Sequence, residues 1–191
     1  MSYPIANPKV IQRAKDVLAL NPVILDTETT GTGFKDVVIE VGIVDVNGKV
    51  LYDKLVNPAR PIPPESSAVN QITDAMVADA PLWRQAWSEI EPILRGRAIG
   101  IYNAEFDMRL LKQSNEAAHL PWTLEYSQAF CIMKLFSAYY GEWNPRYTGF
   151  KAHKLEFAGN LAKIELPNSH HAVEDAKLTA ALLRYMASQK R

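Results

Sequence analysis

Cysteine is almost absent from this chain of 191 residues, in which Cys131 is the only one. A single cysteine excludes an internal disulfide and a zinc site built from several thiolates. It also favours a reduced, intracellular setting. Because no histidine motif accompanies Cys131, we interpret it as a packed small side chain and not as a nucleophile.

An excess of one charge and long apolar runs are also missing. The chain has 21 Lys and Arg against 21 Asp and Glu, so no general basic field predicts tight coating of nucleic acid. The opening stretch MSYPIANPKVIQRAK lacks the apolar core of a secretory signal. No run approaches the ~20 apolar residues of a membrane-spanning helix. We therefore expect a cytoplasmic protein without a membrane partner.

The composition and length predict a single domain. Hydrophobic residues make up 48% of the chain, which suits one compact core at this size. We expect one unit over residues 1–191, with an N-terminal helical extension at 1–22 and a core from about 23 to 188. Apolar spacing predicts helices at 9–20, 82–94, 105–118, 132–140, 155–163 and 172–187.

The remaining apolar segments read as strands. VILDTET and Val37–Val46 are rich in strand-forming residues, and Asn47-Gly48 is a strong hairpin signal before KVLYDKLV. RAIGIYNA predicts a short buried strand ahead of a helix. The fold class is therefore α/β, with a mixed five-stranded sheet: an antiparallel hairpin meander plus parallel strands, flanked by helices. We expect the Pro-rich NPARPIPPESS to be a surface loop, and Gly141–Gly149 to be an aromatic loop.

The first strand carries two carboxylates where few are expected. In VILDTETTG, Asp26 and Glu28 are two residues apart, so their side chains point to the same face. Strands disfavour both residue types, and partial burial would increase the repulsion between the two charges. The pattern predicts either a bound cation between them or a proton on one of them.

Two further carboxylates extend this pattern. Asp107 lies in YNAEFDMRLL and Asp175 in HHAVEDAKLTAALL, each in the first turn of a predicted helix. An acid in a first turn also favours the helix dipole, so each has a purely structural interpretation when taken alone. The four acids together are typical of a site for Mg²⁺, which prefers carboxylate and water ligands and leaves positions for phosphate oxygens.

A histidine precedes the last of these acids. His170 and Asp175 are five residues apart, about 140° around an ideal helix, so both can face one site only if His170 lies before the helix. A loop histidine that titrates near neutrality suits a general base. The adjacent His171 has no assigned role.

These motifs resemble the DnaQ-like DEDDh 3′–5′ exonucleases, which are grouped around the proofreading subunit of bacterial DNA polymerase III. The resemblance covers about Val23 to Met186 and rests on DTETTG, YNAEFDMRLL and HHAVEDA in that order. It implies a ribonuclease H-like fold and two Mg²⁺ ions, for which Mn²⁺ can substitute. The metal ligands that it implies are Asp26, Glu28 and Asp175 directly, with Asp107 mainly through water.

The resemblance also implies the other roles at the site. His170 would be the general base, so the catalytic set is Asp26, Glu28, Asp107, His170 and Asp175. The terminal nucleotide would be held by Thr29, Thr30, Asn103 and Phe106, and the product would be a nucleoside 5′-monophosphate. Three positions depart from the family pattern: Tyr102 replaces a common histidine, Thr32 replaces an apolar wedge residue, and Asn70-Gln71 replaces a His-Gly pair.

We therefore expect a metal-dependent 3′–5′ exonuclease that acts at the 3′ ends of single-stranded nucleic acid, DNA before RNA, in DNA repair or replication. One alternative is an exoribonuclease that trims RNA 3′ ends, because no contact to a 2′-hydroxyl can be identified. Others are a non-catalytic nucleic-acid-binding module and a proofreading subunit whose partner is a DNA polymerase. No tethering tail follows Arg191, which favours a free-standing enzyme; a homodimer stays open.

Aromatic residues outside these motifs have two interpretations. Trp83 and Trp87, at helical spacing, are expected in the core. A second group is a candidate single-strand contact, because stacking of bases on aromatic rings tolerates any sequence. Its members are Tyr139, Tyr140, Trp143 and Tyr147, with Arg146, Lys151 and Lys154 nearby.

Overall fold

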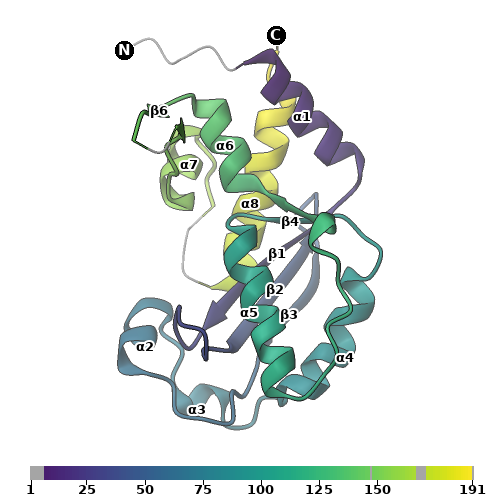
Figure 1. Ribbon diagram of the computed structural model, residues 1–191, viewed down its shortest axis with the longest axis vertical. Helices are drawn as coiled ribbons and strands as arrows, with labels where there is room; N and C mark the ends of the chain where they lie inside the picture. The colour runs from purple at the N-terminus through teal and green to yellow at the C-terminus, as the bar shows by residue number, and fades with distance from the viewer. Residues whose placement is uncertain (1–6, 147, 167–170, 191) are drawn as a thin grey trace.

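A five-stranded mixed sheet forms the centre of the computed structural model, which describes residues 7–146, 148–166 and 171–190 (Figure 1). The sheet order is β3-β2-β1-β4-β5, antiparallel between β1, β2 and β3 and parallel from β1 through β4 to β5. This confirms the predicted mixed sheet. The strands are β1 (Val23–Thr29), β2 (Val38–Asp45), β3 (Val50–Leu55), β4 (Ile99–Ile101) and β5 (Ala129–Cys131).

Helices cover both faces of this sheet, and the predicted helices are present within a few residues of their expected ends. The helices are α1 (Pro8–Ala19), α2 (Pro64–Asn70), α3 (Asp74–Val77), α4 (Trp83–Leu94), α5 (Ala104–Ala117), α6 (Ile132–Tyr140), α7 (Leu155–Leu161) and α8 (Ala172–Ser188), with a 3₁₀ turn at Tyr126–Gln128. In the described part of the chain, no helix is both long and apolar enough to cross a membrane.

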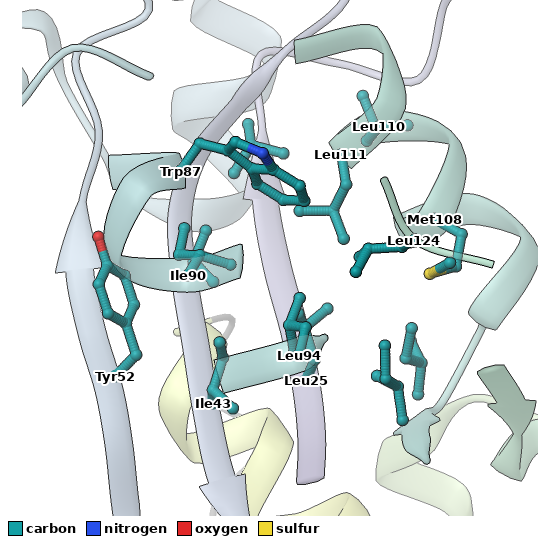
Figure 2. Close-up of a cluster of buried hydrophobic side chains, with 14 of the residues drawn as sticks. Leu25, Ile43, Tyr52, Trp87, Ile90, Leu94, Met108, Leu110, Leu111 and Leu124 are labelled. Atoms are coloured by element: carbon teal, nitrogen blue, oxygen red, sulfur yellow. The ribbon is translucent and has the colours of Figure 1, made fainter. Parts of the chain in front are cut away.

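One face of the sheet packs against α4 and α5. Figure 2 shows Leu25 and Ile43 from the sheet beside Leu94 of α4, in one cluster with side chains of α5. Trp83 and Trp87 belong to this cluster and stack on each other with ring centroids 5.7 Å apart, which confirms their expected place in the core. The alternation of the strand puts Leu25 on this face and Ile24 on the other.

The opposite face is covered by α8, with α1, α6 and α7 around it. Gly42 of β2 sets how closely α8 can approach, because a Cβ atom there would lie 2.3 Å from the backbone nitrogen of Val173. A glycine inside a strand often marks such a close approach of another backbone. The helix that carries Asp175 is thereby held directly against the sheet.

The turn between β2 and β3 forms as its sequence predicts. Asp45 accepts backbone hydrogen bonds from Asn47 (2.8 Å) and Lys49 (2.9 Å) through its side chain. Gly48 takes a φ of +88°, in the left-handed region that a glycine adopts without steric cost. The Asn-Gly pair is therefore confirmed as the hairpin turn.

Two segments that were expected to be loops contain regular structure. α2 begins at Pro64 inside the Pro-rich stretch, because a proline at the start of a helix gives up only an N–H that would have no helical partner. The aromatic stretch after α6 forms a short antiparallel hairpin of β6 (Trp143–Asn144) and β7 (Gly149–Phe150). Gly141 ends α6 at a φ of +80°, which lets the chain reverse into this hairpin.

Candidate active site

The end of β1 brings three of the predicted carboxylates together. Asp26 and Glu28 point to the face covered by α8, where Asp175 lies buried in the first turn of that helix. One ligand oxygen from each of the three lies within 4.8 Å of the others. The arrangement has two causes: side chains two residues apart on β1 point to the same face, and α8 packs closely against β2.

Asp107 reaches the site from the other side of β1. It lies in the first turn of α5, is only 3% exposed, and accepts a 2.8 Å hydrogen bond from the Thr27 hydroxyl. Thr27 points away from Asp26 and Glu28, so strand alternation alone would not place Asp107 beside them. Its charge nevertheless acts on Asp26 more strongly than that of any other carboxylate.

The carboxylates strongly resist losing their protons in the absence of a cation. Burial raises the pKa of Asp26 well above its usual value, and the charges of Asp107 and Asp175 raise it further. Burial and the charge of Glu40 raise the pKa of Glu28 to about 8. Burial likewise raises the pKa of Asp107 to about 7, although the hydrogen bond from Thr27 lowers it. With all of its carboxylates ionised, the site would hold more negative charge than its surroundings compensate.

This donor set fits divalent cations that prefer oxygen ligands. Mg²⁺ and Mn²⁺ bind carboxylates readily and share such sites with phosphate oxygens. A cation among Asp26, Glu28 and Asp175 would offset the burial and the repulsion that raise the pKa values of Asp26 and Glu28. The residues present therefore fit the metal that the sequence predicts.

Glu40 is a buried acid that the sequence motifs do not reveal. It stands directly across from Glu28 in the β1–β2 pair, and the register shifts immediately after this pair. Like charges opposite each other destabilise a sheet, but Glu40 accepts a 2.8 Å hydrogen bond from the backbone of Ala172 and lies 3.6 Å from His171. Glu40 thus caps α8 and fixes the end of the helix that presents Asp175. A glutamate in the middle of an apolar run was the available signal.

A pocket of about 510 Å³ lies on one side of the carboxylates. Thr29, Thr30 and Phe106, three of the four residues predicted to bind substrate, line it together with the loop that follows β1. The hydroxyl of Thr30 donates to Asp36 at 2.8 Å, so this side chain holds the loop in place. Asn70 from α2 closes the pocket and donates a 3.3 Å hydrogen bond to the carbonyl of Thr29.

Asn70 and Gln71, which stand where the family pattern has a His-Gly pair, lie at the end of α2. Gln71 takes a φ of +61° at the end of α2, a left-handed conformation that glycine adopts without cost. The position therefore needs the conformation that the family's glycine supplies, and Gln71 adopts it with some strain. Asn70 is almost fully buried, and its side-chain hydrogen bond lowers the pKa of Glu28.

A second pocket, of about 500 Å³, opens on the other side of the carboxylates. Asn103, the fourth predicted substrate residue, lines it, and Phe106 lines both pockets. The opposite wall is formed by residues 152–156, which precede and begin α7. Tyr102, which stands in place of a common histidine, donates from its hydroxyl to the carbonyl of His153 at 2.8 Å and so holds this wall.

The predicted base, His170, lies outside the described residues. His171 is described, and its contact with Glu40 gives it a structural role that the sequence did not indicate. Cys131 is half-buried, and its thiol lies 3.4 Å from the carbonyl of Tyr102. This is the packed position expected of it.

The fold and the carboxylate cluster together define a nuclease of the ribonuclease H-like class. The RNase T family, described as exonuclease, matches residues 23–183. The chain belongs to this exonuclease family, among the DnaQ-like enzymes that its motifs resemble.

Individual relatives agree with this membership. The chain is 33% identical over 189 residues to the uncharacterized exonuclease CP81 of Escherichia phage 186, covering 96% of each protein. It is similar to a structure of exonuclease X in complex with 5′-overhanging duplex DNA, with 30% identity, a TM-score of 0.62 and coverage of 86% of this chain and 90% of that one.

A more distant structure shares the fold. The nuclease domain of 3′hExo, a DEDDh family member bound to rAMP, has 17% identity and a TM-score of 0.68 over 85% of this chain and 89% of that one. Several other relatives are longer proteins, and the chain spans between 11% and 42% of their length.

The raised pKa values predict how the metal-free protein responds to pH. Because the folded-state pKa of Glu28 lies above its value in the unfolded chain, its contribution to stability is largest below about pH 4.5 and is lost as the pH rises towards 8. In the presence of a chelator we expect the thermal midpoint to fall between pH 5.5 and 8.5, by about 2–4 °C for each kcal/mol lost.

A Glu28→Gln variant isolates this effect. It removes one of the repelling acids and should show a smaller fall, measured by thermal unfolding in chelator across the same pH range. The lowered pKa of His153, caused by its burial, acts in the opposite direction but is common to both proteins. Identical pH profiles for the wild type and Glu28→Gln would contradict the prediction.

Proposed function

We propose that this chain is a metal-dependent 3′–5′ exonuclease that releases nucleoside 5′-monophosphates from the 3′ ends of single-stranded DNA. The observation that carries the proposal is the meeting of two pockets at the cluster of Asp26, Glu28 and Asp175. One pocket can take the terminal nucleotide and the other the strand that precedes it, so the scissile phosphate would lie against the carboxylates.

The acids would hold the cations. Asp26, Glu28 and Asp175 would be direct ligands, and Asp107 would act through water, since its carboxylate already accepts a hydrogen bond from Thr27. Two divalent cations, when bound, supply an activated water and neutralise charge on the leaving oxygen. Glu40 would act as a positioning residue, because it caps the helix that presents Asp175.

The terminal nucleotide would be held in the pocket lined by Thr29, Thr30 and Phe106. The Phe106 ring lies between the two pockets, with the Arg109 guanidinium 5.4 Å from its centre, so it is placed to contact the last base. Asn103 lines the neighbouring pocket beside the carboxylates. His170 would accept the proton of the attacking water as general base.

DNA is the favoured substrate because the exonuclease X structure contains DNA. The rAMP in the 3′hExo domain keeps RNA as the alternative. A non-catalytic binding module is disfavoured, because burial raises the pKa values of Asp26, Glu28 and Asp107, a cost that a bound cation would offset. Some longer relatives are DNA polymerase III proteins, so association with a polymerase stays an alternative, and the oligomeric state stays open.

A direct assay tests the proposal. Purified protein should shorten a 5′-labelled linear single strand from its 3′ end, one nucleotide at a time, with Mg²⁺ and not in excess chelator. A circular single strand of the same sequence is the matched control and should remain intact. Cutting of the circle would identify an endonuclease. Faster degradation of the RNA version would reassign the substrate.

A further inference from the structure

The short β6–β7 hairpin concentrates exposed aromatic side chains. Among the described residues, five aromatic side chains are exposed: Phe34, Tyr126, Trp143, Phe150 and Phe157. Three of these lie within 15 positions, on the hairpin and on α7 directly after it. Exposed apolar groups that gather in one place, in contrast to single scattered ones, indicate a binding surface.

The two hairpin rings are held in a defined arrangement. Trp143 and Phe150 are partners across the hairpin, with ring centroids 5.5 Å apart at an interplanar angle of 88°. Beyond this pair, the backbone of Lys151 donates to the carbonyl of Glu142 at 2.8 Å, and their side chains form an ion pair at 3.1 Å. These contacts at the base of the hairpin hold both rings facing solvent, at 56% exposure for Trp143 and 46% for Phe150.

The hairpin is joined to the active-site pocket. Glu142 lies 3.3 Å from His153, and His153 and Lys154 line the pocket that contains Asp26 and Asp175. In Figure 1 the hairpin and α2, which closes the pocket for the terminal nucleotide, lie towards opposite ends of the same side of the molecule. A strand that leaves the terminal pocket past the carboxylates would be directed towards the hairpin.

The charge of this segment suits a phosphate backbone. Within the described residues, Glu142 pairs with Lys151 and His153, whereas Arg146 and Lys154 have no carboxylate partner. The chain as a whole is neutral, so a general field would contribute little to strand affinity. Stacking on aromatic rings beside local cations is the means by which a neutral protein can hold a single strand.

We propose that Trp143 and Phe150 form a stacking platform for the bases of a single strand upstream of its 3′-terminal nucleotide, with Arg146 and Lys154 contacting its phosphates. The proposal rests on the proposed function, which supplies the direction of the strand. It also revises the aromatic group expected from sequence. Tyr139 and Tyr140 are half-buried, with their rings about 6 Å from that of Phe136, and Tyr147 lies outside the described residues.

Substrates of two lengths distinguish strand binding at the hairpin from hydrolysis at the carboxylates. An oligothymidylate of about 20 nucleotides exceeds the ~4–16-nucleotide sites typical of single-strand binding folds. A dinucleotide, in contrast, has only one nucleotide upstream of the scissile phosphate and no further strand for the hairpin to bind. Trp143→Ala and Phe150→Ala should each raise KM for the long strand by about 5- to 150-fold, the range for loss of one base stack. Their kcat and their hydrolysis of the dinucleotide should not change.

Two further variants serve as controls. Tyr126→Ala removes an aromatic ring of similar exposure (53%) from a different part of the surface, and should leave both substrates unaffected. Trp143→Phe keeps a stacking ring and should restore most of the affinity. Thermal midpoints and gel-filtration volumes establish that each variant is folded and whether its oligomeric state changes.

Every other result supports or overturns the stacking platform. Unchanged KM for the long strand in Trp143→Ala overturns the platform, and so does an equal loss on the dinucleotide, which would mean that the hairpin acts on the active site itself. A change of oligomeric state with unchanged KM would identify a contact between proteins instead. If the wild type hydrolyses neither substrate, the proposed function fails. Anisotropy of a labelled single strand in chelator then tests the platform alone: binding lost in Trp143→Ala supports it, and equal binding overturns it.

Discussion

Replacing Asp26 by alanine is expected to lower the rate of hydrolysis of single-stranded DNA by about 10²- to 10³-fold or more, as for the loss of a principal electrostatic contact in a transition state. Asp26 stands at the centre of the cluster, and its carboxylate is affected by the charges of Asp107, Asp175 and Glu28. Removing it would take one ligand from the cation site. Release of labelled nucleotide with saturating Mg²⁺ measures the effect, and excess chelator should reduce the wild type to the same level.

A second variant at this position, Asp26→Asn, should not be less stable than the wild type. In chelator, Asp26→Asn removes one repelling charge at nearly constant volume, so its thermal midpoint should equal or exceed that of the wild type at pH 8. Glu105→Gln is a matched control in the first turn of α5, because Glu105 is exposed and outside the cluster, and it should retain activity. Activity of Asp26→Ala in Mg²⁺ close to that of the wild type would contradict the assigned site.

Strand periodicity was sufficient to predict the core of this arrangement. The two-residue spacing of Asp26 and Glu28 placed them on one face, and the Asn-Gly turn fixed the hairpin meander that packs beside them. Both inferences depend on contacts close in sequence, where backbone geometry decides the outcome. The helical stripes of α4, α5 and α8 were predictable for the same reason.

The parts that could not be predicted depend on contacts between distant segments. Thr27 binds Asp107 across 80 positions, and Glu40 caps α8 across 132 positions. No local pattern specifies such pairs; they follow from the way in which α5 and α8 pack on opposite faces of β1. Gly42 shows the same dependence, because its role appears only once the backbone of α8 lies against it.

The aromatic hairpin illustrates a different difficulty. Trp143 and Phe150 are seven positions apart, and the intervening residues include Pro145 and Gly149, which are typical of loops as well as turns. Each strand of the hairpin has only two paired residues, which is too short for an alternation of apolar and polar residues to be recognised in the sequence. The sequence therefore indicated the aromatic character of the segment but not which rings would be exposed.

Two adjacent histidines provide the last test of the site. If His170 accepts the proton of the attacking water, His170→Ala should lower kcat by about 10²- to 10⁴-fold, the usual contribution of a positioned general base. Mg²⁺ affinity, measured by the metal concentration that gives half-maximal activity, should change little, because a general base is not a metal ligand. The spacing from Asp175 places His170 ahead of α8, so its replacement need not disturb the helix.

His171→Ala is the internal control, and the structure gives it an expected effect of its own. His171 lies 3.6 Å from Glu40, whose other partner is the first backbone N–H of α8. Loss of this partly exposed contact should cost no more than about 1 kcal/mol of stability and should leave kcat within a few-fold of the wild type. Because Glu40 keeps its bond to Ala172, the helix end and Asp175 should stay in place. Equal losses of kcat in the two variants, or a larger loss in His171→Ala, would mean that the base has been assigned to the wrong histidine.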